Sequence, residues 1–215
     1  MPSKEIAIKN SVILASFLLV IWGFYRFLFQ LPEEVEEFLI KPIIWLIPTI
    51  VLLKKEGSKL SSVGITSKNL YPSIYLSVTL GTFFIIEAMI INYLKHERLD
   101  FGSFIGNKPL LESFVITFAT AVSEEIAFRG FLFNRVWHAL KKEWTANIIT
   151  SIVWGLIHVP VTVFVWKFDL YSSLVYLFLV TLFGIGSAFV FARTKNVASS
   201  IFLHVLWQWP IILFR

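Results

Sequence analysis

The sequence of 215 residues contains no cysteine, and only 15% of its residues are charged. Without cysteine, the chain can form no disulfide bond, thiolate metal site or cysteine nucleophile. A soluble domain of this size has about 25% charged residues. The low charge, the 57% hydrophobic content and the mean hydropathy of +0.76 therefore predict an integral membrane protein. No basic stripe interleaved with aromatic residues suggests nucleic acid as a partner, which leaves the lipid bilayer as the expected surroundings.

Long apolar runs divide the chain into segments near the length of about 20 residues that crosses a bilayer. They predict an all-α, polytopic transmembrane helix bundle of about seven spans, with six to eight possible. The predicted spans are 11–29, 38–53, 71–94, 110–133, 145–166, 171–191 and 197–214. The second is short and contains Lys41, and Pro160 should interrupt the fifth. No linker divides the chain, so 1–215 is expected to form a single membrane domain.

The basic residues predict the orientation of the bundle. With the N-terminus in the cytoplasm, most Lys and Arg fall on the cytoplasmic side, in the N-terminus and around 54–68, 135–142 and 193–195. The acidic segment 33–37 falls on the opposite side. Because cytoplasmic loops are enriched in Lys and Arg, a cytoplasmic N-terminus is favoured. The short loops and compact size favour a multi-pass protein of a bacterial or archaeal cell membrane.

Glu124, Glu125 and Arg129 lie deep inside the fourth predicted span. Charges at that depth cost at least a few kcal/mol each unless they are paired or hydrated, so they indicate function. Glu125 and Arg129 are four residues apart and can form an ion pair on one face of a helix. Glu124 is turned by about 100° from Glu125. With Arg129 paired to Glu125, Glu124 is left without a cation partner on its own helix, which suits a general base.

Two histidines on other spans reach a similar depth. At about 1.5 Å per residue, Glu124, His158 and His204 lie in one layer to within a helical turn. Gln208 follows His204 by four residues and shares its face, so both can donate hydrogen bonds toward one point, as a developing oxyanion requires. We therefore predict that these groups converge. The alternative interpretation is that these polar side chains hold the spans together by hydrogen bonds between helices.

The remaining charged residues in the spans invite simpler interpretations. Arg26 and Lys41 lie near the ends of their spans and are expected to snorkel toward the interface. Glu87 is isolated in the third span and is expected to face a polar interior.

The charged and polar residues form three ordered motifs: Glu124-Glu125-x-x-x-Arg129, Trp154-x-x-x-His158 and His204-x-x-x-Gln208. This set resembles the motifs of the CPBP family, the CAAX protease and bacteriocin-processing group of intramembrane glutamic endopeptidases that includes the type II CAAX prenyl endopeptidase. The family pattern is EExxxR, FxxxH and HxxxN or HxxxD on separate helices. The resemblance places a CPBP-like catalytic core at 111–215, in the C-terminal half.

The resemblance implies an intramembrane peptide hydrolase without a cofactor. Glu124 would match the glutamate that activates water, with His158 helping to position it. His204 and Gln208 would match the pair that stabilises the oxyanion. The substrate would be a membrane-associated protein or peptide, cut near a terminus or leader. A prenylated CAAX tail, a bacteriocin leader and a sorting anchor all fit.

The same resemblance assigns supporting roles and shows two departures. Glu125 and Arg129 would match the structural remainder of the first motif. Trp154 stands where the family has Phe, which keeps an aromatic wall of another size. Gln208 stands where the family has Asn or Asp, which keeps a donor on one extra methylene.

Two alternatives remain open from the sequence. Glu124, His158 and His204 have the ligand types of a zinc site, although no two of them have the HExxH spacing of a zinc-binding helix. The protein could also be a catalytically impaired family member that acts as a peptide-binding scaffold, with Gln208 marking the loss of activity.

Overall fold

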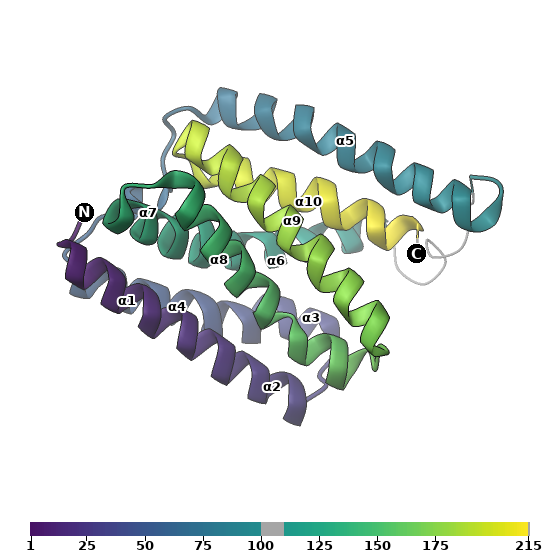
Figure 1. Ribbon diagram of the computed structural model, residues 1–215, viewed down its shortest axis with the longest axis horizontal. Helices are drawn as coiled ribbons and strands as arrows, with labels where there is room; N and C mark the ends of the chain where they lie inside the picture. The colour runs from purple at the N-terminus through teal and green to yellow at the C-terminus, as the bar shows by residue number, and fades with distance from the viewer. Residues whose placement is uncertain (100–109, 215) are drawn as a thin grey trace.

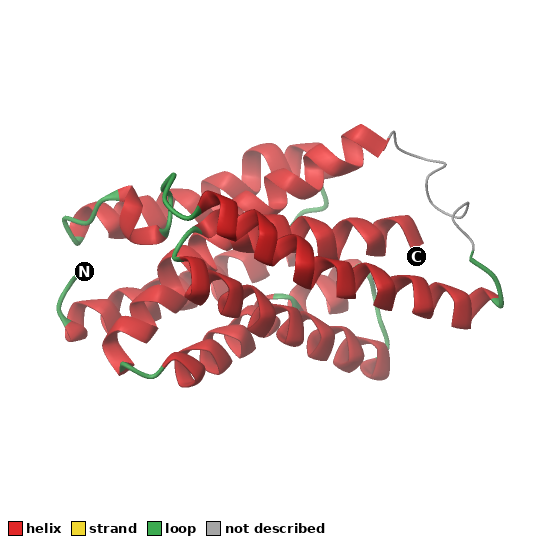
Figure 2. Cartoon of the chain, turned by 90° about the horizontal axis from the view of Figure 1, so that it is seen from above, coloured by secondary structure: helices red, strands yellow, loops and turns green. Residues whose placement is uncertain are grey.

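In the computed structural model of the protein, residues 1–99 and 110–214 are described (Figure 1). Within these two ranges the chain consists of helices and connecting loops (Figure 2), so the predicted all-α bundle is confirmed. In chain order the elements are α1 (Lys4–Phe17), η1 (Leu18–Trp22), α2 (Gly23–Leu28), α3 (Glu33–Val35), η2 (Glu36–Ile40), α4 (Lys41–Lys55), η3 (Leu60–Val63), α5 (Leu70–His96), α6 (Leu110–Glu125), η4 (Ile126–Phe133), α7 (Asn134–Leu140), α8 (Glu143–Ile157), η5 (Val161–Val165), α9 (Leu170–Thr194) and α10 (Val197–Phe214). Element η3 is a 3₁₀ helix, and the other η elements are π-helical.

Consecutive elements join into helical rods that coincide with the predicted spans. Within the described residues, four rods are long and apolar enough to cross a membrane: Lys4–Leu28, Leu70–Leu94, Glu143–Val165 and Leu170–Thr194. The rods that contain α4 and α6 fall outside this set because they carry more than two charged side chains, and the apolar helix Val197–Gln208 falls outside it because it is shorter than 18 residues. The charges in the middle of these rods, namely Lys41, Glu124, Glu125 and Arg129, are buried against other helices, so the bundle rather than lipid surrounds them.

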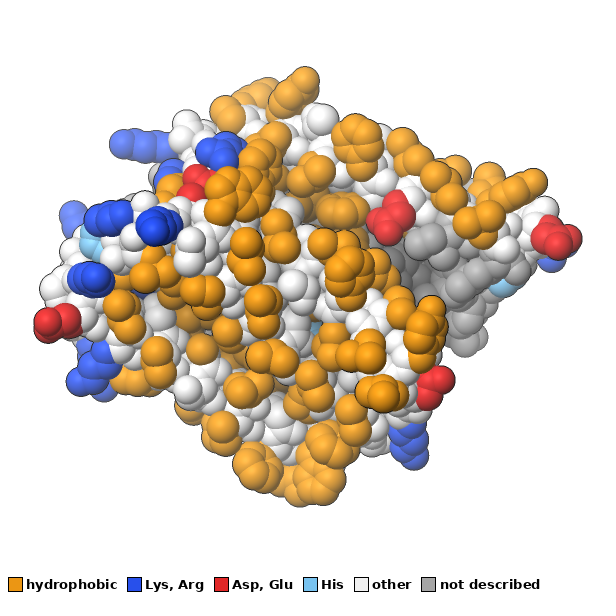
Figure 3. All heavy atoms as spheres, viewed as in Figure 1, with side chains coloured by type: hydrophobic (Ala, Val, Ile, Leu, Met, Phe, Trp, Pro, Cys, Tyr) orange, Lys and Arg blue, Asp and Glu red, His pale blue; other side chains and the backbone are white. Residues whose placement is uncertain are grey.

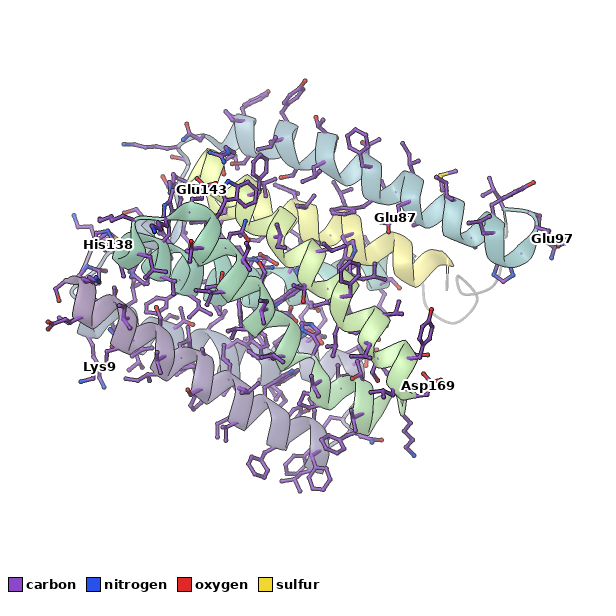
Figure 4. The ribbon with its side chains drawn as sticks, in the orientation of Figure 1. Lys9, Glu87, Glu97, His138, Glu143 and Asp169 are labelled. Atoms are coloured by element: carbon purple, nitrogen blue, oxygen red, sulfur yellow. The ribbon has the colours of Figure 1, made fainter. Side chains whose placement is uncertain are left out.

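The surface of the bundle divides into an apolar middle and a basic end. Large hydrophobic side chains such as Phe24, Leu94 and Phe178 are more than half exposed. Figure 3 shows orange side chains across the middle of one face and blue Lys and Arg gathered at the end where the N-terminus lies. An apolar belt of this kind matches a bilayer environment. Glu87 is exposed on α5 (Figure 4), so the expectation that it faces a polar interior is wrong.

Buried aromatic rings connect the helices around the centre of the bundle. Trp45 of α4 lies 5.7 Å from Phe128 of η4, ring centroid to ring centroid, and Phe128 lies 6.4 Å from Trp154 of α8. Trp154 in turn lies 5.3 Å from Phe183 of α9. Aromatic pairs at such distances contribute about 0.5–1.5 kcal/mol each beyond their buried area. This chain of rings fixes α4, α8 and α9 around the helix that carries the charged motif.

That central helix changes character directly after its two glutamates. The sequence pattern predicts one helix over 110–133, but α6 ends at Glu125 and the π-helical segment η4 continues from Ile126 to Phe133. Pi-helical turns are rare and occur frequently at functional sites, where they change the direction of nearby side chains. Glu124 and Glu125 both precede the change, so the predicted angle of about 100° between them still applies.

A polar cluster fixes the basic end of the bundle. Arg135 of α7 donates a hydrogen bond of 2.8 Å from Nε to Oε2 of Glu56, and neither side chain is exposed to solvent. Asn10 of α1 donates to Oε1 of the same carboxylate at 3.0 Å. The cluster thus holds α1, the end of α4 and α7 together. Arg135, expected from the sequence to be one of the cytoplasmic loop charges, is a buried residue.

Replacing Gly130 with Ala should destabilise the bundle by about 1–3 kcal/mol, the usual cost of overpacking. A Cβ at this position in η4 would lie 2.5 Å from the carbonyl oxygen of Val63 in η3. Because that oxygen belongs to the backbone, it cannot move aside cheaply. Gly186→Ala is the control, since its Cβ would meet other atoms only at 3.8 Å. Thermal unfolding of both variants in detergent checks the prediction, and equal unfolding temperatures would contradict it.

Candidate active site

A cavity of about 440 Å³ lies between the helices of the bundle. Residues from both halves of the chain line it. The N-terminal half contributes Trp22, Arg26, Leu31, Glu33, Glu36, Glu37 and Lys41, and the C-terminal half contributes Thr120, Glu124, Trp154, His158, Val161, Trp166, Tyr176, His204, Trp207 and Gln208. Its volume is within the range of small-ligand pockets, about 300–1,000 Å³. The glutamate and both histidines singled out from the sequence therefore meet in one cavity.

Glu125 lies behind the cavity wall and is fully buried. Arg129 donates from Nη1 to Oε1 of Glu125 at 3.2 Å, as the spacing of four residues predicts. Ser187 of α9 donates to Oε2 at 2.7 Å, and the Nδ1 of His204 lies 2.8 Å from Oε1. The carboxylate thus joins η4, α9 and α10. With both oxygens engaged, Glu125 is suited to bracing the site rather than to reacting.

Glu124 faces the cavity and is paired with a cation from a distant helix. The Nζ of Lys41 donates to its Oε1 at 2.9 Å. Lys41 also contacts Glu37 at 2.6 Å, and Thr120 of α6 donates to Oε2 of Glu37 at 2.6 Å. These residues form a buried network of a lysine and two carboxylates.

The network corrects the expectation that Lys41 snorkels to the interface. Lys41 is only 4% exposed, because α4 packs against α6 and places the ammonium in the cavity wall. One sequence signal could have identified it. Glu37 precedes Lys41 by four residues, in the same acid-first order as Glu125 and Arg129.

Arg26 is also paired with a carboxylate of the acidic segment 33–37. Its Nη1 forms an ion pair with Oε2 of Glu36, and the hydroxyl of Tyr25 donates to Oε1 of the same residue at 2.9 Å. The side chain of Arg26 is 12% exposed, so the expectation that it snorkels is also wrong. The acidic segment expected to be an outer loop therefore contributes to the cavity wall.

His158 is positioned by the end of its helix. Its backbone N–H bonds the carbonyl of Gly155 at 2.9 Å, three residues back, which leaves the carbonyl of Trp154 free. The Nδ1 of the His158 ring lies 2.7 Å from that carbonyl. A carbonyl oxygen can only accept, so Nδ1 carries the proton and, in the neutral ring, Nε2 keeps a lone pair. Pro160 restricts the chain here, and α8 ends before it as predicted.

Trp154 forms the centre of the site wall. Its ring centroid lies 4.7 Å from that of His158 and 5.8 Å from that of His204. The guanidinium of Arg129 lies 4.3 Å from the ring, within cation–π distance. The indole of Trp154 therefore separates Arg129 from the cavity. It also sets the distance between His158 and His204.

His204 and Gln208 both line the cavity, but they are held differently. Because Nδ1 of His204 faces Glu125, only Nε2 of this ring can act toward the cavity. The amide oxygen of Gln208 is buried and has no hydrogen-bond partner among the described residues. Buried polar atoms in native proteins rarely lack a partner. A bound ligand or a water molecule would donate the missing hydrogen bond to the amide oxygen of Gln208.

The contact of Glu124 with Lys41 bears on the zinc alternative. The carboxylate of Glu124 already contacts the ammonium of Lys41, whose positive charge would repel a metal cation. In the part of the chain that the structure describes, no three His, Asp or Glu side chains are grouped as a metal site. The zinc alternative thus gains no support from the geometry, and it stays a prediction that chelation can test.

Residues 106–210 match the sequence model of a family described as Type II CAAX prenyl endopeptidase Rce1-like. This stretch is about half of the chain and includes Glu124, His158, His204 and Gln208. Lys41 and the acidic segment before it lie outside the match. No curated protein matches the chain.

Proposed function

Because residues 106–210 belong to the type II CAAX prenyl endopeptidase Rce1-like family, which is part of the CPBP group of membrane proteases, we propose that the protein is an intramembrane endopeptidase that uses Glu124 as its general base. The single observation that carries this proposal is the convergence of Glu124, His158 and His204 on one cavity. The residues come from α6, the end of α8 and α10, three elements of the matched stretch.

In the first step, Glu124 activates a water molecule. The ionised carboxylate accepts a proton from water while the water oxygen attacks the carbonyl carbon of the scissile peptide bond. His158 assists because the lone pair on Nε2 can accept the second hydrogen of that water. The water is thus held between two acceptors on different helices, which fixes its direction of attack.

The attack converts the carbonyl oxygen into an oxyanion. Gln208 can turn its amide N–H toward that oxygen, and protonated His204 can donate from Nε2 while Glu125 provides the opposite charge at Nδ1. Donors placed where negative charge develops act strongly in a site of low dielectric constant. Removing one oxyanion donor typically costs about 10²–10³ in kcat.

In the last step, the tetrahedral intermediate collapses and the C–N bond breaks. Glu124 returns the proton taken from water to the leaving nitrogen, which departs as an amine. The new carboxylic acid loses its proton to solvent, and Glu124 is again ionised beside Lys41. Each turnover therefore consumes one water molecule and needs no oxidant, reductant or metal.

The size of the cavity favours an extended substrate. A volume of about 440 Å³ admits a short stretch of peptide and excludes a folded domain. Five aromatic residues line it, namely Trp22, Trp154, Trp166, Tyr176 and Trp207. Aromatic side chains of this kind can pack against apolar residues of a peptide, beside the charged and polar residues that line the same cavity. The proposed substrate is therefore the tail or leader of a membrane-associated protein or peptide.

Mapping free protein termini in membranes from wild-type cells and from cells with Glu124→Ala tests the proposal. Termini that occur in wild type and are lost in the variant, while their uncut precursors accumulate, are the expected result. His158→Ala should give the same set of lost termini. Identical termini in all three strains, with the variants present at wild-type levels, would contradict the proposed activity.

A further inference from the structure

We propose that Lys41 is a positioning residue of this site, which holds the carboxylate of Glu124 in place and is itself held by Glu37. The inference rests on the proposed function and extends it to a part of the chain outside the family match. The inference comes from the position of the Lys41 ammonium, which contacts two carboxylates. One is Glu124, the proposed general base, and the other is Glu37, which has no proposed role in the reaction.

The ammonium of Lys41 and the carboxylates of Glu37 and Glu124 form a group that we call the clamp. The Nζ of Lys41 lies 2.9 Å from Oε1 of Glu124, and it contacts both oxygens of Glu37, Oε1 at 2.8 Å and Oε2 at 2.6 Å. Thr120, one helical turn before Glu124 on α6, also donates to Oε2 of Glu37. Glu37 therefore holds the ammonium of Lys41 beside Glu124. Both ends of the clamp are attached to α6, one directly and one through Thr120.

The burial of the clamp distinguishes it from a surface ion pair. The side chains of Lys41 and Glu124 are 5% and 7% exposed. A charged lysine loses much of its hydration at such a site, and only well-placed acceptors compensate for this loss. A lysine that merely anchored α4 would not need to lie against the proposed base. The indole of Trp22, 5.4 Å from Nζ, covers the ammonium on another side.

The reaction explains why two carboxylates share one lysine. Glu124 becomes neutral when it accepts the proton of water, and its attraction for Lys41 then weakens. Glu37 takes no part in the proton transfer, so the ammonium keeps a carboxylate partner during that step. When Glu124 gives up the proton, Lys41 is still in position to receive the carboxylate. Glu37 thus keeps the lysine in place through the whole cycle.

Three variants of the purified full chain test the clamp: Lys41→Met, Lys41→Arg and Glu37→Gln. Loss of a group that orients a catalytic residue typically costs about 10- to 100-fold. Lys41→Met should lower kcat by about that factor while KM changes little, because the substrate still fits the cavity. Lys41→Arg keeps a cation and should recover most of kcat. Glu37→Gln should lie between Lys41→Met and wild type.

Lys54→Met is the matched control, since Lys54 lies on the same helix but is exposed at the basic end. It should retain wild-type kcat and KM. Wild-type kcat in Lys41→Met, or failure of Lys41→Arg to exceed Lys41→Met, would overturn the positioning role.

A second measurement separates this inference from the proposed function. In a double-mutant cycle on thermal unfolding, Lys41→Met and Glu124→Gln should be coupled, with the double variant more stable than the sum of the single effects. This result does not depend on catalysis. Coupling without any Glu124-dependent cleavage by wild type would sink the proposed function and leave the contact intact. Active wild type without coupling would sink the clamp alone.

Discussion

Purified Glu124→Gln protein is expected to lose about 10²- to 10⁴-fold in kcat, the range that general-base catalysis contributes. The amide has the shape of the carboxylate, but it cannot accept a proton from water. It can still accept a hydrogen bond from Lys41, so the cavity should keep its form and KM should change little. Steady-state cleavage of a membrane-associated peptide in detergent or liposomes measures both constants.

Glu87→Gln supplies the control for this prediction. Glu87 is an exposed carboxylate on α5 and does not line the cavity (Figure 4). This variant should cleave at the wild-type rate. If Glu124→Gln kept more than about a tenth of the wild-type kcat, the general-base role would have to be assigned to another group.

The second large effect concerns stability. Arg129→Met should lower the free energy of unfolding by about 3–5 kcal/mol, because removing one partner of a buried pair leaves a charge without compensation. Glu125 is fully buried and would keep Ser187 and His204 as its partners among the described residues. The cation–π contact with Trp154 would also be lost. Chemical or thermal unfolding in detergent measures the change.

Two comparisons make this result specific. Arg193→Met removes an ion pair with Glu143 in which the arginine side chain is 46% exposed, and such surface pairs contribute about 0–1 kcal/mol. Adding Glu125→Gln to Arg129→Met should restore part of the lost stability, since the uncompensated charge disappears. A loss in Arg129→Met no larger than in Arg193→Met would show that the buried pair does not brace the bundle.

Much of the fold follows from the sequence because bilayer thickness limits the choices. Apolar runs of the length of a span predicted where each rod lies, and Pro160 predicted the end of α8. Spacing alone predicted the ion pair of Glu125 and Arg129, since residues four apart share a helical face. Depth counted along each span predicted that Glu124, His158 and His204 reach one layer, and the cavity brings them together.

The contacts that were missed depend on how helices pack. Lys41 is separated by 83 residues from Glu124. The sequence shows that Lys41 is near the end of an apolar run, where snorkelling is common, but not that α4 turns this residue toward α6. The contact of His204 with Glu125 was missed for the same reason. The π-helical segment η4 has no spacing signal, since its residues Ile126–Phe133 continue an ordinary apolar pattern.

The pairing of Lys41 also has a consequence for the synthesis of the protein. Translation proceeds at about 5–20 residues per second, so the 83 residues between the partners take about 4–17 seconds to make. During that interval α4 reaches the membrane with its lysine before α6 exists. Glu37 is the carboxylate available to Lys41 on its own helical rod at that stage. Glu37, which holds Lys41 in the folded site, would then also pair with it while α4 inserts into the bilayer.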